Sequence, residues 1–213
     1  MIKLIKDSRS VCEFGGKSSL FENEVSVYKL FKDIDGYNIF ENNYWQKEFK
    51  DTYIGQGKQF NCDVVNIKTD KKYDLILNSH VIEHIANPLK AIRNWARILN
   101  KNGKILSIVP DKSMMFDCKR PITKFDHLLN DFFNNIGEDD TTHIKEAISL
   151  FVNNGGYDYD NYIKSSKNNL KYRAIHHHCF DNDLVKKMFE FLYFKVIYQE
   201  QKGMHIITIA QYE

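Results

Sequence analysis

The sequence has few cysteines and little net charge. Its 213 residues include the cysteines Cys12, Cys62, Cys118 and Cys179, no two of which form a C-x-x-C pair. This spacing is poor for a zinc knuckle and gives no disulfide framework in a chain of this size, so we expect reduced thiols. The 30 Lys and Arg residues nearly balance the 28 Asp and Glu residues, which argues against a dedicated nucleic-acid binder.

Long apolar runs are also absent. The N-terminal segment 1–7 has no apolar core of signal-peptide length, and the longest apolar runs are only as long as strands. We therefore expect a cytoplasmic protein with no membrane partner. The length fits one domain, residues 1–213.

Short apolar segments alternate with segments in which apolar residues recur at helical spacing. Helical spacing predicts one helix over 24–34 that ends at Gly36. Another helix is predicted to follow Asn87 as N-cap and Pro88 as first helical residue, and to end at Gly103. Strands are predicted at 11–14, 37–40, 60–67, 73–79 and 104–109. This alternation predicts an α/β protein with a parallel sheet.

The C-terminal part combines a long polar segment with a predicted helix and hairpin. A last helix is predicted over 181–191, and 194–198 with 205–210 predict an antiparallel hairpin. Residues 111–178 are too long for an ordinary connection, although 125–133 and 143–152 have helical character. We expect a substrate cap inserted between the fifth strand and the last helix.

Residues 73–111 carry a family resemblance. A Tyr73-Asp74-apolar strand runs into a Glu83-His84-x-x-x-Pro88 turn, and a helix and a second apolar strand follow. This succession resembles the fourth strand, helix and fifth strand of class I S-adenosylmethionine-dependent methyltransferases. The resemblance implies a Rossmann-like, doubly wound, mostly parallel sheet that ends in an antiparallel hairpin, with S-adenosylmethionine as cofactor.

The loop after the first strand is the expected cofactor loop. The family has an acidic-x-Gly-x-Gly-x-Gly pattern there, and this chain matches only its beginning with Glu13, Phe14, Gly15 and Gly16. Glycines let the backbone approach the methionine moiety, and Glu13 can engage its ammonium group. A plain turn is the alternative interpretation of this loop.

Further cofactor contacts are expected at the ends of the next strands. Glu41 is placed to accept both ribose hydroxyls, the alternative being a solvated carboxylate at a strand end. Asp63 resembles the family's acidic residue that receives the adenine amino group, with Val64 beside the ring. Asn78 and Ser79 should line the methionine end.

Methyl transfer needs alignment and, for a hydroxyl acceptor, a base. His80 follows the fourth strand and is the first candidate for that base, with a capping or core histidine as the alternative. His84, Asp111 and His127 are further catalytic candidates.

A mechanism that depends on a divalent cation is the alternative to a histidine base. His80, Glu83 and His84 lie at i, i+3 and i+4, which share one face of a helical turn. The group resembles the E-x-x-E-H motif of metal-dependent O-methyltransferases, with a histidine in place of the first glutamate. His176 and His178 would add ligands if the segment is extended, because they then point to the same side. The shorter EH-x-x-x-P pattern also occurs in metal-free relatives.

The cap carries a second resemblance. Its Pro110-Asp111-Lys112, Phe116-Asp117, Arg120-Pro121-x-Thr123 and His176-x-His178 motifs are similar to a bacterial methyltransferase subgroup found in surface-polysaccharide gene clusters. This implies a small, polar, sugar-like acceptor. Arg120, Lys112 or Lys119 would then hold a phosphate or carboxylate, with a solvated surface as the alternative.

We therefore expect O-methylation of a sugar, nucleotide-sugar or phosphorylated intermediate of surface-glycan biosynthesis. The alternative is a catalytically inactive binding or assembly module of the same fold. A nicotinamide-dependent oxidoreductase is disfavoured because G-x-G-x-x-G is absent at Gly15.

Overall fold

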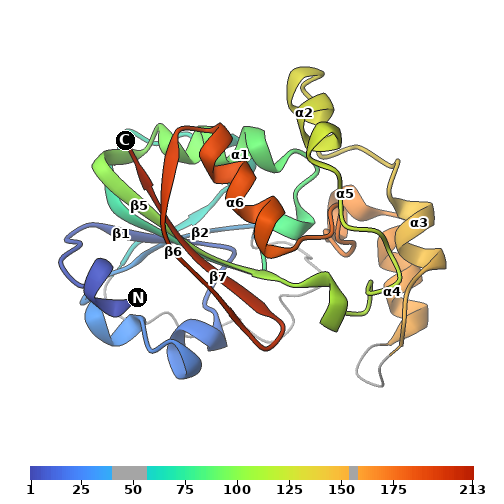
Figure 1. Cartoon of the computed structure of the whole chain (residues 1–213), viewed down its shortest axis with the longest axis horizontal. Helices are drawn as coiled ribbons and strands as arrows, with labels where there is room; N and C mark the ends of the chain where they lie inside the picture. The colour runs from blue at the N-terminus through green and yellow to red at the C-terminus, as the bar shows by residue number, and fades with distance from the viewer. Residues whose placement is uncertain (40–56, 154–157) are drawn as a thin grey trace.

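A seven-stranded sheet organises the structure, a computed structural model that describes residues 1–39, 57–153 and 158–213. The strand order is β3-β2-β1-β4-β5-β7-β6 (Figure 1). The strands are β1 (Val11–Phe14), β2 (Asp35–Asn38), β3 (Gln59–Asn61), β4 (Tyr73–Ser79), β5 (Leu99–Pro110), β6 (Phe194–Lys202) and β7 (His205–Tyr212).

The sheet is mostly parallel, as the sequence predicted. β3, β2, β1, β4 and β5 run parallel, whereas β7 is antiparallel to both β5 and β6. Leu77 of β4 lies in register between Glu13 of β1 and Leu106 of β5. The strand order reverses between β1 and β4, and an open sheet of this kind binds ligands at such a point, beyond the carboxyl ends of its strands.

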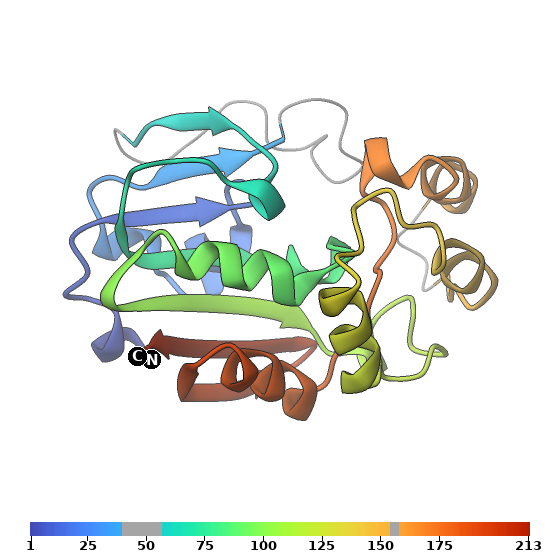
Figure 2. The same ribbon diagram turned by 90° about the horizontal axis from the view of Figure 1, so that it is seen from above.

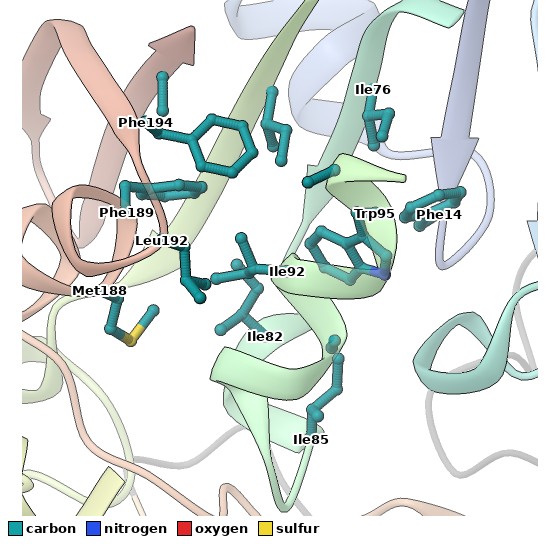
Figure 3. Packing of buried hydrophobic residues seen from close by; sticks show 14 of the residues in the cluster. Phe14, Ile76, Ile82, Ile85, Ile92, Trp95, Met188, Phe189, Leu192 and Phe194 are labelled. Atoms are coloured by element: carbon teal, nitrogen blue, oxygen red, sulfur yellow. The ribbon is translucent and has the colours of Figure 1, made fainter. Parts of the chain in front are cut away.

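Both faces of the sheet are apolar and covered. Helices α1 (Pro88–Ala96) and α6 (Asn182–Phe191) cover one face, and the N-terminal turns cover the other (Figures 1 and 2). Figure 3 shows Ile92 of α1 beside Leu192 and Phe189, with Trp95 on the side of Phe14. The Trp95 and Phe14 rings are 5.0 Å apart, and Trp95 Nε1 donates to the Val64 carbonyl at 2.8 Å. The indole therefore joins α1 to the sheet and to the segment after β3.

Helix α1 begins where the sequence predicted and ends earlier. The Asn87 side chain accepts from the Lys90 amide at 3.0 Å, and Pro88 takes the first helical position. The predicted stop at Gly103 is wrong, because the helix ends at Ala96 and Gly103 lies within β5. The chain turns early so that Leu99 can pair with Tyr73 at the start of β4.

The predicted helix over 24–34 is also wrong. A π turn (Leu20–Glu24) and a 3₁₀ turn (Tyr28–Leu30) occupy this region, and Ser26 has a φ of 51° between them. A left-handed residue breaks a right-handed helix. The apolar residues of this segment are spaced as in a helix because they pack on the sheet. Val27 and Ile34 are buried there without a continuous helix.

The second and third strands are displaced or shortened relative to the prediction. Strand β2 begins at Asp35, so Gly36 belongs to it and ends no helix. Only Gln59–Asn61 of the predicted strand 60–67 pairs with β2. Asp63 then caps a 3₁₀ turn over Val64–Asn66. The predicted ribose ligand Glu41 lies outside the described residues.

Residues between β5 and α6 lie beyond the carboxyl ends of the parallel strands (Figure 2). They form α2 (Phe125–Phe133), α3 (Ile144–Ser149), α4 (Tyr159–Ser166) and α5 (Asn169–Tyr172). The predicted helix 125–133 is confirmed, and the one at 143–152 is shorter than predicted. We call this region, residues 111–178, the cap. Among the described residues, no helix is long and apolar enough to cross a membrane.

Candidate active site

A cavity of about 420 Å³ opens at the carboxyl edge of the sheet, where the strand order reverses. Its size falls within the range of small-molecule and cofactor sites. One end is formed by the loop after β1 and the residues that follow β2 and β3. The other end is formed by the loop after β4, the cap and the β6–β7 turn. The lining residues are Gly15–Leu20, Asn38, Ile39, Cys62–Val65, Ser79–Val81, His84, Ile85, Met115, Phe116, Arg173, His176, Met204 and His205.

The loop after β1 requires its two glycines. Gly15 and Gly16 have φ values of 89° and 91°, which side chains rarely adopt. A Cβ on Gly15 would lie 2.3 Å from Val81 Cγ2, and one on Gly16 would lie 2.5 Å from Asn38 Nδ2. The bare backbone of this loop therefore borders the cavity directly, as a cofactor loop needs.

Glu13 lies behind that loop and not in the cavity wall. It is 1% exposed, and both carboxylate oxygens accept from the Tyr28 hydroxyl at 2.8 and 2.9 Å. Burial raises the pKa of Glu13 to about 8, although the Tyr28 hydrogen bond opposes that shift. In this arrangement Glu13 supports the loop from below through Tyr28, whose hydroxyl also accepts from the Ser18 amide.

The predicted cofactor residues divide into two groups. Gly15, Gly16, Asp63, Val64 and Ser79 line the cavity. Glu13, Phe14 and Asn78 lie outside its lining, because each side chain is buried in the structure behind it: Phe14 packs on Trp95, and Asn78 Oδ1 accepts from the Ser107 hydroxyl at 2.7 Å.

Asp63 is tied to the cap. Its Oδ1 accepts from the Val65 amide at 3.0 Å and its Oδ2 accepts from Arg173 Nη2 at 2.8 Å. Arg173 also pairs with Glu138, which in turn accepts from the Ala86 amide. Sequence reasoning missed Arg173. Its φ of 50°, at the end of α5, brings this cap residue to the edge of the cavity.

The loop after β4 presents His80 to the cavity. His80 has a φ of 53°, its Nδ1 is 3.3 Å from Glu83 Oε1, and its Nε2 is 3.0 Å from His205 Nδ1. Sequence reasoning also missed His205. Because β7 is antiparallel to β5, the start of β7 lies beside the end of β5, with His205 opposite Pro110. The predicted antiparallel hairpin could therefore have indicated that His205 lies near the end of β5.

A second set of ligands lies next to His80. One ligand atom each of Glu83, His84 and His176 lies within 4.8 Å of the others. His84 Nδ1 donates to the Ile175 carbonyl at 2.9 Å, and His176 Nδ1 donates to Asp117 Oδ2 at 2.9 Å, so Nε2 is the coordinating nitrogen in both. A histidine oriented by a carbonyl or carboxylate is typical of metal sites.

The charges in this set suit a divalent cation. Glu83 is fully buried, and within the described parts of the chain neither of its oxygens accepts a hydrogen bond. Burial alone would raise the pKa of Glu83, but the neighbouring His80 lowers it, so the group is a carboxylate. Burial lowers the pKa of His84 to about 3, so its imidazole is neutral. One carboxylate and two imidazoles form a donor set for a transition metal.

The remaining predicted residues lie elsewhere. Asp111 caps the turn Lys112–Met114 by accepting from the Ser113 amide at 2.8 Å. His127 contacts His143 in the cap at 3.0 Å, and neither residue lines the cavity. The structure also separates His176 from His178, contrary to the expectation for an extended segment, because His178 joins His127 and His143.

Arg120 and Lys112 support the backbone of the cap instead of facing the cavity. Arg120 is 2% exposed and donates to the carbonyls of His176 and His177 at 2.6 and 3.0 Å. Lys112 Nζ donates to the carbonyls of Cys118 and Arg120. Both expected alternatives, an acceptor anchor and a solvated surface, are therefore wrong for Arg120.

A family model described as a methyltransferase domain matches residues 1–196. The chain belongs to this methyltransferase domain family. The family recognition made from residues 73–111 is thereby confirmed, and the chain is a methyltransferase domain. Comparison with curated proteins finds no match.

Solved structures share the fold at low sequence identity. Human N-acetylserotonin methyltransferase in complex with SAM aligns with a TM-score of 0.52 and 12% identity, over 98% of this chain and 48% of that one. A S-adenosylmethionine-dependent methyltransferase from Clostridium acetobutylicum aligns with a TM-score of 0.52 and 9% identity, over 97% and 86%. An O-methyltransferase family protein from Burkholderia thailandensis aligns at 0.50 and 9%, over 99% and 52%. The chain thus spans about half the length of the human and Burkholderia proteins.

Proposed function

We propose that this domain transfers a methyl group from S-adenosylmethionine to an oxygen atom of a small polar acceptor. The acceptor is a sugar, a nucleotide-sugar or a phosphorylated intermediate of surface-glycan biosynthesis, and the activity is cytoplasmic. One observation carries the proposal: a glycine loop and a histidine-rich loop line the same cavity, at the point where the strand order of this methyltransferase fold reverses. The matched human structure contains SAM, which supports the choice of cofactor.

The cofactor would occupy the end of the cavity formed by Gly15, Gly16 and Asp63. The glycine loop offers backbone groups at close range, and Val64 and Val65 offer an apolar surface for the adenine ring. Asp63 Oδ2 already pairs with Arg173. An adenine amino group would therefore share or replace that ion pair, which links cofactor binding to the position of the cap.

The acceptor would occupy the end formed by His80, His84, His176, His205 and Phe116. The acceptor oxygen attacks the methyl carbon as the carbon–sulfur bond breaks, and its hydroxyl proton passes to His80 Nε2, which first gives up its contact with His205 Nδ1. Glu83 lies 3.3 Å from His80 Nδ1 and stabilises the imidazolium that forms. The products are the methyl ether and neutral S-adenosylhomocysteine, so the positive charge ends on His80.

A cation at Glu83, His84 and His176 is the second mechanism for the same activity. The unsatisfied oxygens of Glu83 favour it. A bound cation would supply a positive charge for orienting acceptor hydroxyls. In that case a chelator abolishes turnover, and metal restores it in the parent chain but not in His176→Gln.

The decisive test begins with calorimetry of S-adenosylmethionine and S-adenosylhomocysteine binding. Labelled cofactor is then incubated with a panel of nucleotide-sugars, sugar phosphates, phenols and amines. His80→Gln should reduce kcat by about 100-fold or more, as loss of a general base does, with little change in cofactor affinity. Asp126→Asn, which removes an exposed carboxylate in α2, is the control. Absence of cofactor binding overturns the proposal, and transfer to amines alone overturns the oxygen acceptor.

A further inference from the structure

A cluster of histidines in the cap lies apart from the cavity. His127 lies in α2, His143 immediately precedes α3, and His178 is the last residue of the cap, before α6. One ring nitrogen of each lies within 4.8 Å of the others, and none of the three lines the cavity. We propose that His127, His143 and His178 bind a zinc ion that joins separate segments of the cap.

The spacing suits zinc. His127 Nε2 lies 3.0 Å from His143 Nε2. A tetrahedral zinc ion with bonds of about 2.0–2.1 Å holds its ligand atoms roughly 3.3 Å apart, which is close to this distance. Asp131, one turn after His127 in α2, has Oδ2 at 3.3 Å from His127 Nε2 and 3.8 Å from His178 Nε2. Its carboxylate lies beside His127, and water completes the coordination of the ion.

Unsatisfied polar atoms point to a missing partner. The side chain of His178 is fully buried, and its Nε2 donates to the Ala86 carbonyl at 3.0 Å. That hydrogen bond leaves the lone pair on Nδ1, which accepts no hydrogen bond from any residue that the structure describes. Asp131 Oδ2 is likewise buried and makes no hydrogen bond with the described residues, His127 Nε2 being 3.3 Å away. A cation would be the missing partner of His178 Nδ1 and would balance the Asp131 charge.

The cluster is accessible from solvent. The side chains are 0% exposed for His178, 16% for His143 and 40% for His127, which leaves an entry path from solvent.

Three separate parts of the chain meet at this site. A zinc ion there would join α2, the start of α3 and the segment 176–178, and through Ala86 it would contact the turn before α1. His176, two residues from His178, lines the cavity. The ion would thus hold in place the segment that carries one wall of the active site.

The test uses the full chain after removal of metal with a chelator. His84→Gln serves as the background, because it removes a ligand from the set beside the cavity and leaves the cap cluster intact. Zinc is titrated by calorimetry, and cobalt is followed by the visible absorption of its tetrahedral complexes. We expect one zinc to bind this background and to raise its melting temperature.

Adding His143→Gln or His127→Gln should each weaken zinc binding by about 100-fold or more, whereas Asp131→Asn should weaken it by about 10-fold. His127 is the most exposed ligand, so its replacement keeps the test valid if His143→Gln fails to fold. Asp126→Asn, on the same helix, should bind zinc normally. Unchanged zinc affinity in both histidine variants, or no binding by the background, would overturn the proposal.

Discussion

The sheet and the cap are held together by different forces. A large cluster of buried apolar residues packs beneath α1 and α6, and Figure 3 shows part of it. The cap has a small apolar cluster around Phe116 and Tyr162 and buries many polar groups beside it, including Asp117, Arg120 and His176. Apolar burial is non-directional and tolerates small movements, whereas buried polar networks depend on every partner. We therefore expect the sheet and its helices to be the more stable part of the domain. The order of the cap should depend on each of its buried polar contacts.

The largest effect should come from the apolar core. Trp95→Ala removes the indole that packs on Phe14 and the hydrogen bond to the Val64 carbonyl. We expect a loss of about 3–5 kcal/mol in the free energy of unfolding, measured by urea denaturation. Tyr193→Ala, at a side chain that is 81% exposed, should change stability by less than about 0.5 kcal/mol. Similar losses in the two variants would contradict the packing described for α1.

The next effect should be confined to the cap. Arg120→Met leaves the carbonyls of His176 and His177 without their donor and removes the positive charge 3.7 Å from Asp117 Oδ2. We expect a local loss of about 3 kcal/mol, because removal of one partner leaves buried polar groups unpaired. Hydrogen exchange should accelerate in segments 112–123 and 174–179 and stay slow in β4 and β5. Lys119→Met, at an exposed neighbour, is the control. Equal acceleration in the sheet would show that the two regions unfold together.

A smaller effect is expected in the glycine loop after β1. Gly15→Ala places a methyl group 2.3 Å from Val81 and strains a φ of 89°. We expect S-adenosylmethionine affinity to fall by about 10-fold or more in calorimetry, since strain of this kind costs about 1–2 kcal/mol. Gly203→Ala is the matched control: Gly203 also has a positive φ, 58°, but no atom within 4 Å of an added Cβ. Equal losses in both variants would remove the cofactor role of the loop.

The smallest effect concerns the charge of Glu13. Its pKa in the folded state, about 8, lies above its ordinary value of 4.5. The folded state therefore binds more protons than the unfolded state between these values, and wild-type stability should fall as pH rises from about 4.5 to 8. Glu13→Gln cannot ionise, so it should gain stability over the wild type across this window, by about 1 kcal/mol or more at pH 8. Thermal melting between pH 5 and 9 checks this, and parallel curves would contradict it.

Much of the sheet followed from local patterns. Strands β1, β4 and β5, the start of α1, α2, α6 and the closing hairpin were all predicted, because each is marked by an apolar period, a cap or a turn signal. The wrong predictions concern segments whose sequence pattern is typical of a helix but has another structural cause. Val27 and Ile34 have helical spacing and are buried, yet Ser26 interrupts the helix. Gly103 was predicted to end a helix, but it lies within β5, beside Asn102 with its φ of 60°.

The candidate site was predicted less completely. The loops after β1 and β4 could be placed from the sequence because parallel strands bring their carboxyl ends to one edge. Arg173 could not, since no spacing relates it to Asp63 across more than a hundred residues. His205 was missed, although the predicted antiparallel hairpin places the start of β7 beside the end of β5.

The sequence by itself determined the family, the order of the strands and the two loops that meet at the cavity, because these depend on local propensity and on the topology of a parallel sheet. Only the tertiary structure decided that Glu13 lies behind the glycine loop, that His176 and His178 belong to different clusters, and that Arg120 binds backbone carbonyls. Those outcomes depend on how buried polar groups in an irregular cap find partners, and such pairings are set by the packing of distant segments rather than by neighbours in the chain.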